Sequence, residues 1–96
     1  MIKKDLASVR IIVYGDVQGV FFRAFAARKA RELSLKGYSR NLPRGDSVEV
    51  FAEGEKTKLE ELITHLKVGP PAAKVTRVTT NWLAYDGRYS DFSIKF

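Results

Sequence analysis

Residues 15–23 read Gly15-Asp16-Val17-Gln18-Gly19-Val20-Phe21-Phe22-Arg23, and this stretch decides the fold. A β-branched run, 9–13, leads into it and a helix-forming run, 24–33, follows it, which predicts a strand, a turn and a helix. Glycine tolerates positive φ, so Gly15 and Gly19 allow successive backbone N–H groups to turn toward one point. The helix start adds unpaired N–H groups and partial positive charge. The guanidinium of Arg23 adds a planar set of donors that fits a phosphoryl group. The turn therefore predicts an anion-binding site.

The spacing of these two glycines matches neither of the familiar nucleotide-binding loops. The stretch lacks the G-x-x-x-x-G-K-[ST] pattern and the G-x-G-x-x-G pattern. On spacing alone, it is equally compatible with a tight β–α turn whose arginine serves solubility. Both interpretations stay open until the rest of the chain is considered.

Outside this turn, hydrophobic periodicity predicts a second helix and further strands. The first helix is expected over 22–35, and the second runs from a capping box formed by Thr57 and Glu60 to about Val68. The fourth strand has Val75 and Val78 out of phase and is expected either to contain a bulge or to start late. The expected strands are 9–14, 38–42, 47–54, 74–84 and 91–96, the last with Phe92, Ile94 and Phe96 facing inward.

This order of elements predicts an α+β fold. It is a ferredoxin-like sandwich, β-α-β-β-α-β plus a C-terminal strand, with an antiparallel sheet and two helices on one face. In the usual strand order of that fold, strands one and two run parallel with strand three between them. Asn41, at the end of strand two, therefore lies on the same rim as the loop 15–20, two strand spacings or roughly 10 Å away. A phosphoryl group and an attacking water fit that gap.

The composition describes a single domain over 1–96, with 1–8 as a loose N-terminal extension. The chain has no cysteine, one histidine (His65) and no clustered carboxylates, so neither a disulfide nor a metal site is expected. No stretch approaches the ~18 apolar residues of a membrane span, and no apolar signal region follows the first five residues. We expect a cytoplasmic protein without membrane association. The formal net charge of +6 favours anionic partners in general.

The stretch 15–23 resembles the first signature of the acylphosphatases, G-x-V-Q-G-V-x-F-R. The segment Gly37-Tyr38-Ser39-Arg40-Asn41 is similar to a second signature of that family, and it continues through 42–50 and closes at Gly54. The segment 69–75 is a third similarity, and the match covers nearly the whole chain, from about Val9 to Phe96. Two motifs in the right order make the resemblance specific. Asp16 and Ser39 depart from the residues that are usual in this family, and Ser39 is expected to affect packing only.

The resemblance implies hydrolysis of the carboxyl–phosphate bond of acyl phosphates without a metal or cofactor. Arg23 is expected to bind the phosphoryl oxygens. Asn41 is expected to position the attacking water, because an amide side chain both donates and accepts hydrogen bonds. The expected substrate-binding residues are Gly15, Asp16, Val17, Gln18, Gly19 and Val20, chiefly through the backbone amides of 17–20. Gln18 either contacts the ligand or braces the loop, and the carboxylate of Asp16 is expected to weaken affinity unless it points outward.

The expected partners follow from the same resemblance. They are a small-molecule acyl phosphate as substrate and inorganic phosphate or sulfate as site ligands, in a monomer. Two other functions stay open. RNA-binding domains share the fold and the basic charge, but here Phe51 is flanked by Glu49 and Glu53, whose carboxylates are expected to oppose a phosphate backbone. Nucleic acid is therefore disfavoured. A non-catalytic regulatory domain is the other alternative, and the presence of both Arg23 and Asn41 favours an enzyme.

Overall fold

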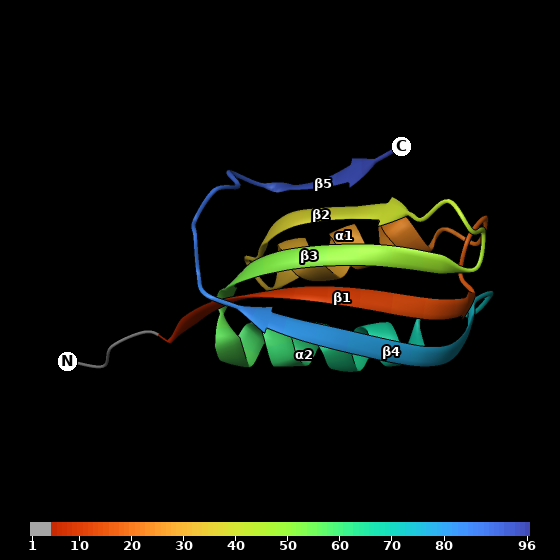
Figure 1. Ribbon diagram of the computed structural model, residues 1–96, viewed down its shortest axis with the longest axis horizontal. Coiled ribbons are helices and arrows are strands. Elements are labelled where there is room, and N and C mark those ends of the chain that lie inside the picture. Colours follow the sequence, from red (N-terminus) through yellow and green to blue (C-terminus); the bar gives the residue numbers. More distant parts are fainter. Residues whose placement is uncertain (1–4) are drawn as a thin grey trace.

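The computed structural model describes residues 5–96 and contains five strands and two helices (Figure 1). The predicted order, β-α-β-β-α-β with one further strand, is confirmed. The elements are β1 (Leu6–Asp16), α1 (Phe22–Glu32), β2 (Lys36–Asn41), β3 (Ser47–Glu55), α2 (Lys56–Val68), β4 (Lys74–Leu83) and β5 (Phe92–Lys95).

The strands form one sheet in the order β4-β1-β3-β2-β5. The pairs β4–β1, β1–β3 and β3–β2 are antiparallel, so β1 and β2 run in the same direction with β3 between them. β5 pairs with β2 in parallel, which makes the sheet mixed rather than wholly antiparallel as predicted. The carboxyl ends of β1 and β2 therefore lie at the same edge of the sheet (Figure 1).

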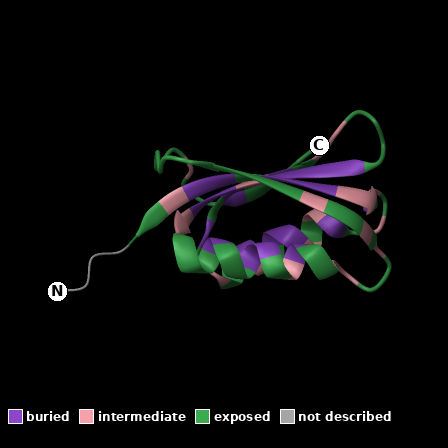
Figure 2. Cartoon of the chain, turned by 60° about the horizontal axis from the view of Figure 1, so that its bottom comes forward, coloured by how far each residue is buried: buried purple, intermediate pink, exposed green. Residues whose placement is uncertain are grey.

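Both helices cover one face of this sheet, and the buried residues lie between the two layers (Figure 2). On the sheet, the predicted alternation holds: Val9, Ile11 and Val13 of β1 point to the helices and are fully buried. Burying aliphatic side chains between the two layers stabilises the fold by roughly 25 cal/mol for each Å² of apolar surface removed from water. The core also contains Val48, Val50, Ala52, Phe22, Ala26, Ala30, Leu59, Leu62 and Leu66.

Three local expectations need correction. Leu6–Ser8 were assigned to a loose extension, but they belong to β1, where buried Ser8 donates a 3.4 Å hydrogen bond to the Glu53 carboxylate. Residues 1–4 lie outside the described part of the chain. The capping box at Thr57 is wrong, because α2 begins at Lys56 after Glu55 without a side-chain cap. Phe96 does not face the core, since it is fully exposed.

The expected bulge in β4 is confirmed. The pairing of β1 with β4 shifts register between Tyr14 and Gly15, which face Arg77 and Val75, and the intervening Thr76 is the extra residue. The Thr76 hydroxyl donates to the Tyr14 carbonyl at 3.2 Å. A bulge bends a strand locally. This one lies opposite Gly15, where the loop 15–20, called the glycine turn below, begins.

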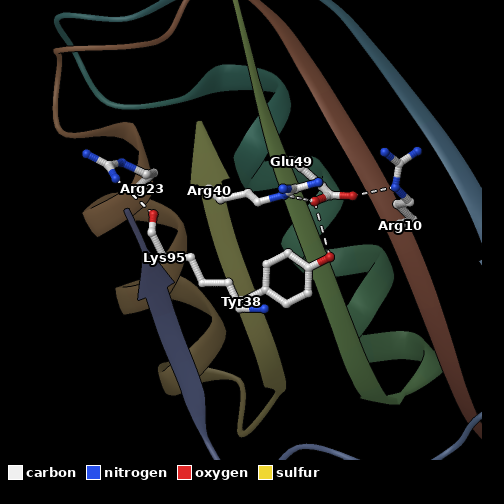
Figure 3. A network of polar contacts seen from close by, with 6 residues as sticks. All are labelled: Arg10, Arg23, Tyr38, Arg40, Glu49 and Lys95. Atoms are coloured by element: carbon white, nitrogen blue, oxygen red, sulfur yellow. Dashed lines mark hydrogen bonds and ion pairs between the residues drawn. The ribbon is translucent and has the colours of Figure 1, made fainter. Parts of the chain in front are cut away.

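The sheet face away from the helices carries Glu49 and Glu53 of β3, and both side chains are buried, although they were expected to be open to solvent. Glu49 is only 2% exposed and accepts hydrogen bonds from Arg10, Arg40 and the Tyr38 hydroxyl (Figure 3). Glu53 is equally buried and accepts backbone N–H bonds from Gly87 and Tyr89. Both carboxylates are thus partnered within the protein rather than open to a nucleic acid backbone, and the expectation that nucleic acid is disfavoured stays a prediction.

Burial alone raises the pKa of Glu49, but hydrogen bonds from Arg40 and Arg10 outweigh it and hold the pKa below the ordinary 4.5. Burial and the neighbouring Glu49 charge raise the pKa of Tyr38, which keeps its hydroxyl protonated as a donor. The glutamate is thus an ionised, fully partnered structural group.

Candidate active site

The loop 15–20 leaves the sheet at the carboxyl end of β1, and glycine is required at its start. Gly15 has φ 132°, and a Cβ there would lie 2.1 Å from the Lys74 carbonyl oxygen. The Gly15 N–H donates to the Asp46 carbonyl at 3.0 Å, which ties the loop to the β2–β3 turn. Gly19 has φ 73°, and a Cβ added to it would meet no atom within 4 Å. Gly15 is therefore needed for the close approach of the Lys74 backbone, whereas Gly19 is needed only for its positive φ.

The backbone amides of the loop divide into two groups. The Val17 N–H was expected to bind a ligand, but it donates to the Gly15 carbonyl at 3.0 Å and is therefore not free. Gln18, Gly19 and Val20 donate no backbone N–H bond within the described residues. α1 begins after Phe21 without a side-chain cap and has no acidic residue in its first turn. Free donors thus gather where the loop enters the helix.

Gln18 braces this loop. Its Nε2 donates to the carbonyl oxygens of Leu42 and Ser47, each at 2.8 Å. These two residues flank the β2–β3 turn, and the Leu42 N–H in turn donates to the Ser47 carbonyl at 3.0 Å. Of the two roles weighed for Gln18, the structure shows the bracing contact. It fixes the glycine turn relative to the end of β2.

Arg23 lies in the first turn of α1, partly buried, and contacts β5. Its Nη1 donates to the Lys95 carbonyl at 2.9 Å (Figure 3), and its guanidinium lies 4.7 Å from the centre of the Phe96 ring. The buried Ser39 hydroxyl donates to the Arg23 carbonyl at 3.1 Å. Ser39 was expected to affect packing only, whereas it also anchors the backbone that carries the arginine.

Asn41 is the last residue of β2. It pairs in register with the helix-facing Val48, so its side chain lies on the helix side of the sheet. Its Oδ1 is buried and has no hydrogen-bond partner among the described residues. Buried acceptors are nearly always satisfied in proteins, so this oxygen marks a place where a polar ligand or water belongs.

Arg23 and Asn41 line the same pocket, which has a volume of about 340 Å³. Val17 and Gly19 line it as well, whereas Gly15, Asp16, Gln18 and Val20 do not. Asp16 is exposed and Val20 packs against the core. The remaining lining residues are Phe21, Phe22, Ala24, Ile94 and Phe96.

Two lining residues, Ile94 and Phe96, were not predicted as site residues. Their alternation was interpreted as a core-facing strand, and no local signal shows that the end of β5 lies beside the first turn of α1. Phe21 also lines the pocket, with 83% of its surface exposed.

Other kinds of site find little support in residues 5–96. No group of three or more His, Cys, Asp or Glu side chains there is placed to hold a metal ion. Within that range, neither helix has the length and apolar content that a bilayer-spanning helix needs. His65 is partly buried on α2 and lines none of the pockets described for this part of the chain.

The family model described as acylphosphatase matches residues 9–94. An acylphosphatase of Dehalococcoides mccartyi is 49% identical over 87 residues, which are 91% of this chain and 96% of that protein. An acylphosphatase structure from Bacillus subtilis has a TM-score of 0.89 and 36% identity, covering 96% of this chain and 100% of that one. A full-length HypF structure has a TM-score of 0.84 and 26% identity, covering 99% of this chain but 12% of that one. The chain belongs to the acylphosphatase family and hydrolyses acyl phosphates.

Proposed function

We propose that the pocket between the glycine turn, α1 and β5 is the active site, with Arg23 and Asn41 as its catalytic residues. The observation that carries this proposal is their meeting in one pocket, where Asn41 offers a buried oxygen without a partner. In this proposal Arg23 and the free N–H groups of 18–20 bind the phosphoryl oxygens. The Asn41 amide positions the attacking water.

The guanidinium has donors to spare for this role. Arginine carries five N–H donors, and one bond is made to the Lys95 carbonyl. The Lys95 and Ser39 contacts hold the side chain and its backbone in place before substrate arrives. Such prior fixation is what makes charge stabilisation effective in catalysis, because no reorganisation is needed at the moment of reaction.

The reaction proceeds by water attack on phosphorus. Asn41 Oδ1 accepts a hydrogen bond from the water, and this aims a water lone pair at the phosphorus atom. As the new P–O bond forms, the bond between phosphorus and the acyl oxygen breaks, and its electron pair leaves with the carboxylate. The proton released by the water passes to a phosphoryl oxygen. Phosphoryl transfer of this kind depends mainly on positioning and on charge stabilisation.

The lining of the pocket restricts the reaction to activated substrates. A carboxylate is a stable leaving group without protonation, so no general acid is needed. The alkoxide of a phosphomonoester does need a proton, and among the described residues the pocket is lined by no Asp, Glu or His. We therefore expect acyl phosphates to be cleaved and simple phosphomonoesters to remain intact.

The setting proposed for this enzyme is a monomer in the cytoplasm. The absence of cysteine suits a reducing compartment. One chain supplies every residue assigned to the site, from β1 through β5. Inorganic phosphate, as product, and sulfate, as its mimic, are the expected competing ligands.

The test is hydrolysis of benzoyl phosphate in the presence of a chelator, with inorganic phosphate as competitor. Arg23→Gln is expected to abolish measurable turnover, and Asn41→Ala to lower kcat by a factor on the order of 10² or more. Arg28→Gln is the matched control, because Arg28 is exposed on the same helix and does not line the pocket. Wild-type kcat/KM in either site variant would show that its assigned role is wrong.

A further inference from the structure

The catalytic pocket has a strongly apolar wall. Beside Arg23 and Asn41, its lining includes Phe21, Phe96 and Ile94. Arg23 is the one cation lining the pocket within the described residues. Binding and hydrolysing a phosphoryl group needs the polar residues, but it gives no reason for the two exposed phenyl rings of Phe21 and Phe96. These rings must serve another part of the molecule that enters the pocket.

Phe21 is held in the open at a conformational cost. It is 83% exposed, and its backbone is left-handed with φ 61° and ψ 25°. A residue with a Cβ pays roughly 1–2 kcal/mol for that conformation, and burial of the ring does not compensate for it. Strained residues of this kind cluster where a function requires them. Here the conformation presents an aromatic ring at the mouth of the pocket.

Phe96 stands beside the phosphoryl-binding group. Its ring centre lies 4.7 Å from the Arg23 guanidinium, and the residue is fully exposed. The cation–π contact holds the ring next to the arginine, so it does not depend on the core for its position. Two exposed rings, from positions 21 and 96, thus line one pocket together with Arg23 and Asn41.

We propose that Phe21 and Phe96 bind the acyl part of the substrate, so that this chain favours acyl phosphates with an apolar, ring-bearing acyl group. The inference rests on the proposed function of the same pocket. Aromatic rings contact other rings favourably and exclude water around them. An acyl group that carries a second phosphate finds no second cation on the pocket wall and is disfavoured. A short acyl group such as acetyl leaves both rings without contact.

The experiment compares kcat/KM for benzoyl phosphate with kcat/KM for acetyl phosphate. The intrinsic reactivities of the two substrates cancel when the benzoyl-to-acetyl ratio of a variant is divided by the wild-type ratio. Phe21→Gly removes the ring while suiting the positive φ, so folding is retained. We expect this variant and Phe96→Ala each to lower the ratio about tenfold, and Phe21→Leu to restore part of the loss.

Tyr85→Ala is the matched control, because Tyr85 is an exposed aromatic residue that lines a different pocket. Its ratio should equal that of the wild type. A second readout is inhibition by the product carboxylate: benzoate should compete better than acetate, and Phe21→Gly should remove the difference. Unchanged ratios in Phe21→Gly and Phe96→Ala, or equal losses with both substrates, overturn the acyl preference.

Failure of this inference is distinct from failure of the catalytic assignment. If acetyl phosphate hydrolysis still requires Arg23 and Asn41 while the ratios do not move, the active site stands and only the acyl preference is wrong. If Arg23→Gln keeps full activity with both substrates, the catalytic assignment fails, and the acyl preference fails with it.

Discussion

The Arg23 guanidinium donates to the Lys95 carbonyl at 2.9 Å, across 72 positions of sequence. This bond gives the arginine a fixed orientation as well as a charge. A lysine keeps the charge but has a single compact ammonium group without the planar fork. We expect Arg23→Lys to lower kcat/KM for benzoyl phosphate on the order of 10²-fold. Arg28→Lys, on the exposed side of the same helix, should have no effect.

The Ser39 hydroxyl anchors the Arg23 backbone at 3.1 Å from a fully buried position. Ser39→Ala removes this donor and is expected to lower the free energy of unfolding by about 1 kcal/mol, measured by urea denaturation. Because the anchored backbone carries the arginine, kcat/KM should also fall in Ser39→Ala. Ser39→Thr keeps the hydroxyl and should retain more activity than Ser39→Ala. Activity identical to wild type in Ser39→Ala would limit this serine to a role in stability.

The two glycines of the turn should respond very differently to alanine. At Gly15 the new Cβ meets the Lys74 carbonyl oxygen at 2.1 Å, so the backbone must move and the protein should be severely destabilised. At Gly19 the space around the Cβ is open, and only the positive φ costs about 1 kcal/mol. Thermal unfolding of the two variants checks this order. A Gly15→Ala protein as stable as Gly19→Ala would contradict the close approach of β1 and β4.

The buried Glu49 makes stability depend on pH. Its pKa is held below 4.5 in the folded protein, so its contribution is present above that pH and is lost as pH falls through the folded pKa. Glu49→Gln should lower the free energy of unfolding at pH 7 by about 2 kcal/mol, because the charge-assisted bonds from Arg10 and Arg40 weaken. The gap between the two proteins should narrow on acidification toward pH 3.

Urea denaturation at both pH values measures that gap. Glu60→Gln is the control, because Glu60 is exposed on α2 and should change little at either pH. If the difference in unfolding free energy between the wild type and Glu49→Gln stays constant from pH 7 to pH 3, protonation of this carboxylate does not affect the stability of the fold.

Asp16 is exposed at the end of β1 and does not line the pocket, although it lies within the loop 15–20. Its charge therefore acts on the substrate through solvent. Asp16→Arg replaces a repulsive charge with an attractive one, so KM for benzoyl phosphate should fall at low ionic strength and the effect should shrink as salt is added. An unchanged KM in dilute buffer would place Asp16 outside the electrostatic field felt by the ligand.

Much of the fold can be predicted because its signals are local. The alternation in 47–54 sets which side of β3 is buried, and the out-of-phase Val75 and Val78 mark the bulge that the structure contains. Gly15 and Gly19 predict the junction between β1 and α1. Once these elements are ordered, the rule that β1 and β2 run parallel around β3 brings Asn41 and Arg23 to one rim.

The rest depends on tertiary partners that no local pattern specifies. Phe92, Ile94 and Phe96 alternate regularly, yet Phe92 is buried and Phe96 is exposed. Phe96 follows the last residue of β5, and its ring lies beside the Arg23 guanidinium rather than in the core. The sequence likewise predicts Glu49 as a solvent-facing charge, since its partners Arg10 and Arg40 come from different strands. Edge strands and buried ion pairs are therefore where prediction from sequence was wrong.

The parallel placement of β5 has a consequence for how the enzyme is made. Ribosomes release the chain from its amino end, and the arginine emerges long before the segment that orients it. Until residues 92–96 have docked beside β2, the pocket lacks one wall, and the guanidinium lacks its carbonyl anchor. The pocket should thus be completed only after β5 has been synthesised and has docked beside β2.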